Sequence, residues 1–353
     1  SKGDNFSHSL PNSVELRLFA ELLDSFKPDI VHVHHFVYLG IEIFAILRKC
    51  LPEARILFTM HDFMAICHHG GSMIKTQEGK QCHRESPIEC SICFPQRDRA
   101  DFFLRKSFIK DHLSKVDLFV ASSQFLAKRY EQWGLDQNKI RVMENYLAPV
   151  ERIPPRQLLD GEKRTKFAYF GQLNKLKGIH IILEALNYLP QNLRNEVSVV
   201  IYGSNLDKQT KDFQKKIRHQ IESTSGVHFG DSYETEDLPV LMAECDWVIV
   251  PSLWWENSPL VIQEAIAFGR PLIGSNIGGT KEKIEDIAGL TFLAGNPISL
   301  ASKMTEAIQP SCFDYWIENL PTGRNILGEY YDLYDEMTLS QKKKSPIKSP
   351  LSN

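Results

Sequence analysis

Long hydrophobic runs are missing from this 353-residue sequence, and no apolar stretch approaches the roughly 18 residues that a membrane-spanning helix needs. The opening residues Ser1-Lys2-Gly3-Asp4 also lack the apolar segment of a secretory signal. Cysteine is sparse and unevenly spread, with seven in the chain, which does not fit a secreted disulfide scaffold. From these absences we expect a cytoplasmic protein.

An excess of positive charge is missing too. The 41 Lys and Arg residues against 44 Asp and Glu residues give a formal net charge of -3, so nucleic acid is not an expected partner. The chain does have a hydrophobic content of 42%, which is enough to build buried cores. A chain of this length ordinarily forms two domains.

Short apolar strands alternate with helical segments along most of the chain, a pattern typical of parallel α/β layers. In the first half we expect strands at residues 29–33, 55–59, 117–121 and 140–144, and helices at 14–26, 39–50, 102–116 and 123–133. In the second half we expect strands at 167–171, 197–203, 227–230, 247–251, 271–274 and 290–293, and a closing helix at 329–337.

A proline-containing linker at residues 148–161 separates the two halves. The predicted organisation is therefore a first domain at residues 1–150, with an irregular cysteine-rich insertion at 67–96, and a second domain at 151–337. The Lys/Ser/Pro-rich end, 338–353, is predicted to be a disordered tail.

Residues 251–269, PSLWWENSPLVIQEAIAFG, hold the densest set of candidate site residues. They follow a buried strand, and residues 257–259 predict a helix start with Asn or Ser as the cap and Pro at the first position. Glu256 precedes this helix, and Glu264 lies about two turns inside it. Because a helix start offers unpaired N–H groups to an anion, the stretch suits a nucleotide-sugar.

Further motifs follow in order along both halves. The second half carries Phe170-Gly171-Gln172-Leu173, Lys177-Gly178, Ile201-Tyr202-Gly203, His228-Phe229-Gly230, Pro251-Ser252, Glu256-Asn257-Ser258-Pro259, Glu264-Ala265 and Ile277-Gly278-Gly279. The first half carries Pro28-Asp29-Ile30-Val31-His32, Thr59-Met60-His61-Asp62 and Ala121-Ser122-Ser123-Gln124-Phe125-Leu126. Together they resemble the retaining glycosyltransferases of family 4, the group 1 enzymes. The resemblance implies an α/β GT-B fold, with two Rossmann-like domains whose parallel sheets face a central cleft.

The resemblance also implies an activity. Such an enzyme is a retaining, metal-independent, hexosyltransferase-type glycosyltransferase that needs no cofactor for catalysis. It moves a sugar from a UDP- or GDP-sugar donor, bound by the second domain, to a glycan or lipid-linked acceptor in polysaccharide or glycolipid biosynthesis. The leaving phosphate itself can take the acceptor proton.

Three residues match the family's main donor contacts. Glu264 would bind both ribose hydroxyls through charge-assisted hydrogen bonds, and the alternative is a solvated helix glutamate. Glu256 would orient the donor sugar and stabilise positive charge at its anomeric carbon, and the alternative is a glutamate that caps the next helix. Lys177 would stabilise the leaving diphosphate, and the alternative is an exposed loop lysine.

The remaining implied residues surround these three. His61 ends a strand of the first domain and would contact the donor sugar or shape the acceptor site, or else be a packed or capping histidine. The other expected donor-binding residues are Gly171, Gln172, Tyr233, Ser258, Pro259, Leu260, Gly278, Gly279 and Thr280.

The sequence departs from the family pattern in two places. Family members open with a strand and a glycine-rich loop that nothing before Asp29 supplies, so we expect the chain to begin inside its first domain. Gln172 stands where the family usually has arginine, which removes one cation from the phosphate site. Both departures favour an alternative function, a catalytically incomplete donor-binding protein or a subunit that needs a partner.

Four cysteines, Cys67, Cys82, Cys90 and Cys93, fall in the irregular insertion, and the last two form a C-x2-C pair. Four thiolates in a core-poor loop suit a structural Zn2+, with free thiols or disulfides as the alternatives. Downstream, the basic amphipathic stretch 102–115 predicts either a core-packing helix or a peripheral contact with the inner membrane surface.

Overall fold

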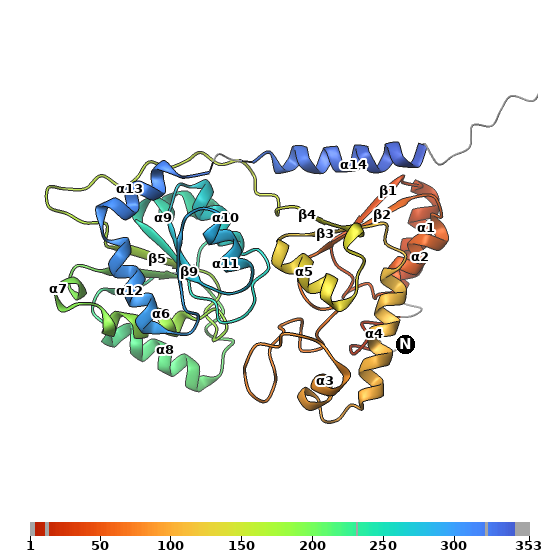
Figure 1. Ribbon diagram of the computed structural model, residues 1–353, viewed down its shortest axis with the longest axis horizontal. Coiled ribbons are helices and arrows are strands. Elements are labelled where there is room, and N and C mark those ends of the chain that lie inside the picture. The colour runs from red at the N-terminus through yellow and green to blue at the C-terminus, as the bar shows by residue number, and fades with distance from the viewer. Residues whose placement is uncertain (1–3, 11–13, 231, 322–323, 343–353) are drawn as a thin grey trace, which may run out of the picture. The chain divides into compact units, whose positions relative to one another are not determined.

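The computed structural model describes residues 4–10, 14–230, 232–321 and 324–342, and the chain divides into two compact α/β units (Figure 1). The first unit comprises Ser1–Tyr146 and Asn325–Asn353, and the second comprises Leu147–Arg324. Each unit has one parallel sheet, as the sequence predicts. Of the helices in the described ranges, none combines the length and apolar character that crossing a bilayer requires.

The first unit is built on four parallel strands in the order β1-β2-β3-β4. These strands are β1 (Ile30–Val33), β2 (Arg55–Met60), β3 (Leu118–Ala121) and β4 (Ile140–Val142). Its helices are α1 (Val14–Phe26), α2 (Ile43–Cys50), α3 (Pro87–Cys93), α4 (Arg99–Leu113), α5 (Gln124–Trp133), the short 3-10 turn η1 (Gln137–Lys139) and α14 (Ile326–Lys342).

The boundaries of these helices follow from local chemistry. Ser123 caps α5 by accepting a hydrogen bond from the backbone N–H of Leu126, and Gly134 ends it in the left-handed conformation with φ of 104°. A capping box formed by Asp98 and Asp101 starts α4.

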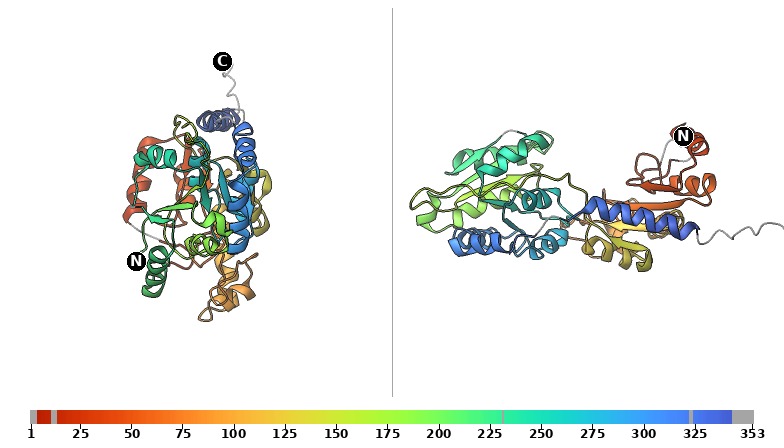
Figure 2. Two further views of the ribbon diagram at one scale, coloured as in Figure 1. Left: turned by 90° about the vertical axis from the view of Figure 1, so that its left-hand side faces the viewer. Right: turned by 90° about the horizontal axis from the view of Figure 1, so that it is seen from above.

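Helix α14 returns from the end of the chain to the sheet of the first unit (Figures 1 and 2). Its Leu333 and Met337 pack against Leu57 and Val120 in one buried cluster, and Tyr334 Oη lies 2.8 Å from Nδ1 of His32 on β1. The sequence-based placement of residues 329–337 in the second domain is therefore wrong. The predicted tail also begins too early, because residues 338–342 continue α14, whereas 343–353 lie outside the described residues.

The second unit has six parallel strands in the order β10-β9-β8-β5-β6-β7. They are β5 (Lys166–Phe170), β6 (Ser198–Tyr202), β7 (Val227–Phe229), β8 (Trp247–Val250), β9 (Leu272–Ser275) and β10 (Leu290–Phe292). The helices are α6 (Ile179–Ala185), α7 (Gln191–Arg194), α8 (Lys211–Ser223), α9 (Leu238–Glu244), α10 (Leu260–Ala267), α11 (Gly278–Glu285), α12 (Pro297–Ala307) and α13 (Pro310–Glu318), with 3-10 turns η2 (Leu186–Tyr188) and η3 (Thr235–Asp237).

Both faces of this second sheet are buried. Along β5, Phe167 and Tyr169 belong to one hydrophobic core, and the alternate residues Ala168 and Phe170 belong to another. Such burial explains the nearly continuous apolar strands in the sequence. Numbered from β5, the strand order is 3-2-1-4-5-6, the dinucleotide-binding Rossmann order, whose ligand crevice lies where β5 and β8 adjoin.

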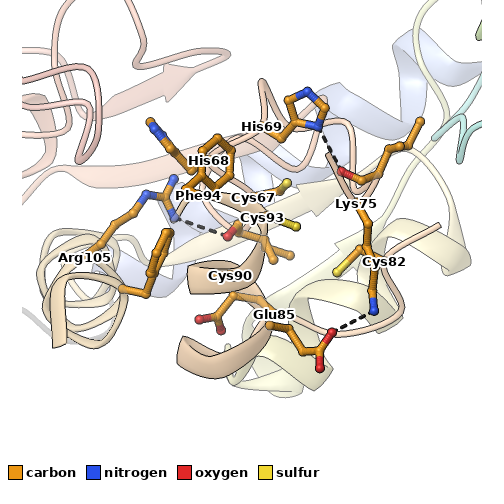
Figure 3. A pocket seen from close by; sticks show the side chains of 14 residues that line it. Cys67, His68, His69, Lys75, Cys82, Glu85, Cys90, Cys93, Phe94 and Arg105 are labelled. Carbon is orange, nitrogen blue, oxygen red and sulfur yellow. Dashed lines mark hydrogen bonds and ion pairs between the residues drawn. The ribbon is translucent and has the colours of Figure 1, made fainter. Parts of the chain in front are cut away.

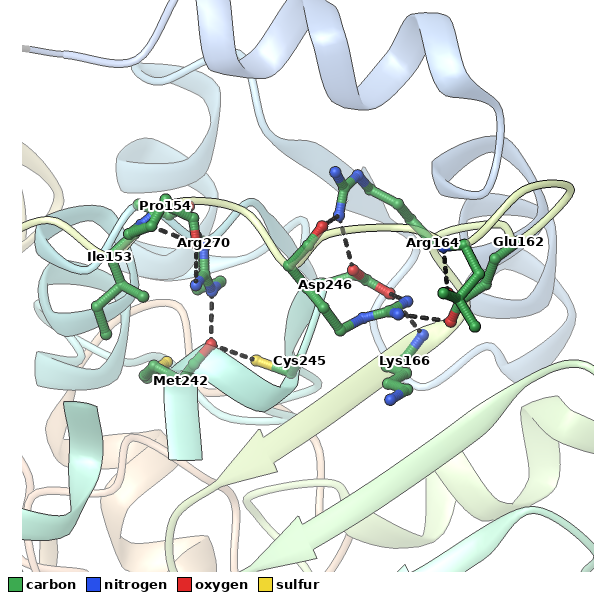
Figure 4. A network of polar contacts seen from close by, with 12 residues as sticks. Ile153, Pro154, Glu162, Arg164, Lys166, Met242, Cys245, Asp246 and Arg270 are labelled. Carbon is green, nitrogen blue, oxygen red and sulfur yellow. Dashed lines mark hydrogen bonds and ion pairs between the residues drawn. The ribbon is translucent and has the colours of Figure 1, made fainter. Parts of the chain in front are cut away.

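The linker predicted at residues 148–161 has no regular structure, but it is fastened to the second unit (Figure 4). The fully buried carboxylate of Asp246 pairs with Arg156 and Arg164, each at 3.1 Å. Nearby, the buried Arg270 donates to the carbonyls of Ile153 and Pro154. A buried carboxylate held by two guanidinium groups is costly to disrupt, so this end of the linker is fixed.

The insertion at 67–96 differs from its prediction as an irregular segment. It contains α3, which Ser86 caps by accepting a hydrogen bond from Glu89 N–H, and Pro87 occupies the first helical turn. A short antiparallel bridge between Ile74 and Gln81 precedes this helix.

Candidate nucleotide-sugar site

The loops after β5 and β8 meet at the carboxyl edge of the second sheet. The N–H of Leu253 donates to the carbonyl of Leu176 at 2.7 Å, which joins the two loops directly. Gly178 has φ of +77°, and a Cβ there would lie 1.9 Å from the carbonyl oxygen of Pro251. Only glycine permits this approach. The backbone therefore brings Lys177 beside the loop that carries Glu256.

Lys177 and Glu256 form an ion pair, with 2.6 Å between Nζ and Oε1. The same oxygen accepts hydrogen bonds from Ser252 Oγ at 2.9 Å and from Trp254 Nε1 at 2.6 Å. Glu256 is only 8% exposed, so three donors hold its carboxylate in one orientation. Its second oxygen, Oε2, accepts no hydrogen bond from any residue that the structure describes.

Ser252 and Trp254 were not among the expected site residues. Their signal was their position in the PSLWWE run that leads to Glu256, but a sequence does not tell which side chains turn back onto the carboxylate. Asn174 was missed as well. Its Oδ1 accepts from the Lys177 N–H at 2.9 Å, and its Nδ2 donates to Oε1 of the exposed Gln172 at 3.3 Å.

Helix α10 begins one residue later than predicted. Pro259 itself occupies the cap position, and no side chain caps the helix, so neither Asn257 nor Ser258 has the expected role. The N–H groups of Leu260 and Val261 have no partner among the described residues. Two N–H groups and the positive helix end thus remain available to an anion beside the Glu256 loop.

Helix α11 starts against the same loop. The N–H of Gly279 donates to the carbonyl of Glu256 at 2.7 Å, and a Cβ on Gly279 would lie 1.8 Å from the Asn257 carbonyl oxygen. Gly278 has φ of +57°, which also favours glycine. The Thr280 side chain is fully buried, and its Oγ1 has no partner in the described chain. Any contact from Thr280 to a ligand would therefore come from its backbone.

Glu264 lies on α10 close to Tyr233. Burial raises the pKa of the Glu264 carboxyl, and its side-chain oxygens bind no described residue. Burial, with the charge of Glu264 as a second cause, raises the pKa of Tyr233 to about 12. The Tyr233 ring packs edge-on against Phe170, which stacks on Tyr202 with 5.1 Å between centroids. The Glu264 carboxylate, a hydrogen-bond acceptor, thus lies close to the aromatic cluster of Tyr233, Phe170 and Tyr202.

Three other expected residues have different settings. Gly171, with φ of +150°, follows β5 directly, and its N–H donates to the Tyr202 carbonyl at 3.1 Å. Ser258 is buried, whereas Leu260 is half exposed at the start of α10.

His61 belongs to the first unit and follows β2, as predicted. Its Nε2 lies 3.1 Å from Nδ1 of His34, and the two rings are stacked. Burial, together with the neighbouring His34 and His35, lowers the pKa of His61, which favours its neutral form. Alongside, Nε2 of His35 lies 3.0 Å from Oδ2 of Asp62. His61 is therefore one member of a histidine cluster at a strand end, where α/β proteins bind ligands.

The four insertion cysteines line one pocket (Figure 3). All are free thiols, and burial raises the pKa of Cys67 and Cys82, and that of Cys90 to about 12. Within the described ranges, no three His, Cys, Asp or Glu side chains are arranged to hold a metal ion, so the expected zinc stays a prediction.

Helix α4 packs into the first unit through Phe102, Ile109 and Leu113, which are nearly inaccessible. Two of its basic residues are engaged: Arg105 is buried, and Lys106 pairs with Glu85 at 2.8 Å. The core-packing interpretation of residues 102–115 fits these contacts, and the membrane contact stays a prediction.

Solved structures resemble most of this chain. HepE of Anabaena, solved in complex with UDP and glucose, aligns with a TM-score of 0.64 at 18% identity, covering 92% of this chain and 81% of that one. The sucrose-phosphate synthase of Thermosynechococcus elongatus aligns with a TM-score of 0.66 at 18% identity, covering 92% of this chain and 78% of the other. The fold is GT-B, that of many glycosyltransferases.

Two family models then assign the chain. Residues 151–313 match the glycosyl transferases group 1 model, and residues 4–147 match the glycosyltransferase family 4 model. The protein belongs to the group 1 glycosyltransferases, as the sequence motifs predicted.

The similar proteins found by sequence share only about a quarter to a third of their aligned residues with this chain. An uncharacterized 41.2 kDa protein in the cps region of Klebsiella pneumoniae is 27% identical over 315 residues, covering 86% of this chain and 75% of that protein. Spore coat protein SA of Bacillus subtilis is 33% identical over 247 residues, covering 68% of this chain. The match spans 59% of the spore coat protein's own length.

Proposed function

We propose that this protein transfers a sugar, with retention of anomeric configuration and without a metal ion, from a nucleoside-diphosphate-sugar to a glycan or lipid-linked acceptor. The observation that carries the proposal is the Lys177–Glu256 pair at the junction of β5 and β8, next to an uncapped helix start. UDP is the nucleotide to test first, because the similar HepE was solved with UDP.

The geometry suits the diphosphate and the sugar together. The ammonium of Lys177 and the free N–H groups of Leu260 and Val261 are donors for phosphate oxygens, and they stabilise the charge that develops as the sugar–phosphate bond breaks. When Lys177 turns to a phosphate, the Glu256 carboxylate still holds Ser252 and Trp254. It can then face the anomeric carbon and its developing positive charge.

The nucleoside end has its own partners. Glu264 offers two unpaired carboxylate oxygens for the ribose hydroxyls, and the charge-assisted bonds would be strong at this partly buried position. The protonated phenol of Tyr233 and the cluster with Phe170 supply an aromatic surface for the base. Gly171 and Gly278 to Thr280 would contribute backbone groups.

The acceptor side is assigned to the first unit. Neutral His61 can donate or accept one hydrogen bond, which suits a sugar hydroxyl. The leaving phosphate takes the acceptor proton as the new glycosidic bond forms on the face from which it departs. A lipid-linked acceptor would be reached from the cytoplasm, with the protein at the inner membrane surface.

A second candidate is a protein that binds the donor but needs a partner for transfer. Gln172 favours it, since this exposed, uncharged side chain stands where the family usually has arginine. The nearby Lys175 is exposed as well, and the structure gives its side chain no hydrogen bond or ion pair to the described residues.

One assay distinguishes the two candidates. The purified full chain is incubated with UDP-glucose, UDP-galactose, GDP-mannose or ADP-glucose and a panel of glycan and lipid-linked acceptors, while nucleoside diphosphate release and thermal stability are measured. A transferase releases the nucleotide in step with a product that keeps the donor's anomeric configuration, as NMR can read. A donor-binding subunit is stabilised by the nucleotide without turnover. An inverted product would contradict the retaining mechanism.

A further inference from the structure

The insertion of the first unit offers a separate site, independent of the proposed activity. Three segments bring its thiols to one pocket: Cys67 follows the turn after β2, Cys82 follows the Ile74–Gln81 bridge, and α3 carries Cys90 and Cys93 (Figure 3). Because the last two are three positions apart on a helix, they lie on the same face.

Within the insertion, Met73 and Ile74 are buried, but hydrophobic burial does not explain how α3 is held in place. No residue of helix α3 is fully buried, and Ile88 and Ile92 are about half exposed. Polar contacts fasten the helix instead, including the ion pair of Lys75 with Glu89 at 2.7 Å. Exposed ion pairs contribute little to stability. Small scaffolds with little core ordinarily add a disulfide or a structural metal, and α3 is in a similar position.

A buried cation beside the thiols is the second, independent observation. Arg105 is 5% exposed, yet within the described residues no carboxylate lies within ion-pair distance of its guanidinium. It donates only to backbone carbonyls and approaches His8. The acidic residues that line the pocket are already paired, Glu85 with Lys106 and Glu89 with Lys75. A buried charge without a counter-charge is costly.

We propose that Cys67, Cys82, Cys90 and Cys93, hereafter the four-cysteine cluster, bind one structural Zn2+. Four thiols lose their protons to solvent as four zinc–sulfur bonds form, and no electron is transferred. The product carries two negative charges, which supplies the counter-charge that the buried Arg105 lacks.

Zinc binding requires the four thiols to turn toward one another. In the present arrangement the Cys82 thiol donates to the carbonyl of Arg84 at 3.4 Å, and no three sulfurs are placed to share an ion. Rotation about each Cα–Cβ bond selects among staggered positions and can turn the sulfurs inward. The histidines at the pocket are engaged otherwise: Nδ1 of His69 lies 2.9 Å from the Ile74 carbonyl oxygen, and His68 packs on Phe94.

The first measurement is the metal content of the full chain purified in metal-free buffer. We expect one zinc per chain by mass spectrometry. Replacement by Co2+ should give the sulfur-to-cobalt charge-transfer and visible bands of a tetrahedral thiolate site. A chain without zinc that also gives no such bands with Co2+ would overturn the proposal. So would mass spectrometry that finds the four cysteines joined in disulfides.

Variants locate the site. Loss of a residue that only supports a metal ligand typically weakens metal binding by roughly tenfold or more, and Cys90→Ser, which removes a ligand, should weaken zinc binding further. Cys312→Ser, in the second unit, should keep one zinc per chain. Equal zinc contents in the two variants would contradict the assignment.

A second readout does not depend on a variant folding. Removing zinc from the unaltered chain with a chelator should speed tryptic cleavage after Lys80, whose side chain is 77% exposed in the insertion. Added zinc should restore protection. Unchanged cleavage would mean that no metal holds the segment.

Discussion

Lys177 Nζ lies 2.6 Å from Glu256 Oε1, although the two residues are 79 positions apart in the sequence. The pairing depends on β5 and β8 being neighbours in the sheet, since each residue stands in the loop that follows one of these strands. An ammonium and a carboxylate are therefore held together at the place where this strand order binds ligands.

The first prediction concerns Lys177. Replacing it with alanine should lower kcat for sugar transfer by about 100-fold, because a fixed cation at the leaving group acts mainly in the transition state. The matched control is Lys175→Ala, two residues away and exposed, which should keep normal kinetics. Steady-state kinetics of the two variants decide the point, and equal rates would rule out a role for Lys177 at the diphosphate.

Glu264 is predicted to bind the nucleoside. Glu264→Gln should weaken UDP binding about tenfold, because charge-assisted hydrogen bonds to the ribose become neutral ones. Isothermal titration measures the change, with the half-exposed Glu285→Gln as the control. Unchanged affinity in the Glu264 variant would remove this carboxylate from the donor site.

Glu264 also predicts a pH dependence of stability. Burial raises its pKa in the folded protein above the value of about 4.3 in the unfolded chain. The stabilisation from the protonated carboxyl is therefore complete below about pH 4.3 and is lost as the pH rises through the folded pKa. Without ligand, Glu264→Gln should match the unaltered protein's Tm in acid and exceed it at pH 7. A lower Tm at pH 7 would contradict this.

Gly178 should tolerate no side chain. Gly178→Ala forces a Cβ to 1.9 Å from the Pro251 carbonyl oxygen at φ of +77°, and should cost at least about 3 kcal/mol of unfolding free energy. Gly161 is a matched control, with the same φ and no atom within 4 Å of its Cβ position. Gly161→Ala should cost only about 1 kcal/mol from backbone strain. Urea unfolding of both variants gives the comparison. Equal losses of unfolding free energy would show that the loop at Pro251 moves to accommodate the new Cβ.

His32 predicts acid sensitivity of the first unit. Burial, with the nearby His34 and His61 as further causes, lowers its pKa to about 3, and its ring nitrogens lie close to Thr59 and Tyr334. A depressed pKa gives stability that is present above about pH 6.5 and is lost as the pH falls toward 3. His32→Gln should flatten the loss in unfolding free energy between pH 7 and pH 5. The exposed His219→Gln should not, and equal slopes would count against His32.

Much of the fold could be predicted because strong local signals agree with the tertiary structure. The α1 boundaries match the apolar spacing, and the ten strands of the described residues lie inside the expected segments or within one residue of them. Helix α3 was missed because it is short and none of its residues is fully buried, so it has no apolar period. The partner of α14 was misassigned because nothing in its sequence tells which of two apolar sheets it will cover.

For the candidate site, the sequence names residues but does not give their contacts. The motifs named Glu256, Glu264 and Lys177, but the ion pair and the donors Ser252 and Trp254 depend on how two loops fold back on each other. The helix cap was misjudged for a similar reason. The Asn257 carbonyl lies against Gly279, and Pro259 occupies the cap position of α10.

The return of α14 to the first sheet means that the polypeptide passes between the units twice, near residues 146 and 325. A single proteolytic nick in the linker would therefore not release either unit. A fragment that ends at residue 146 would lack α14 and so uncover Leu57 and Val120, and it would be prone to aggregate.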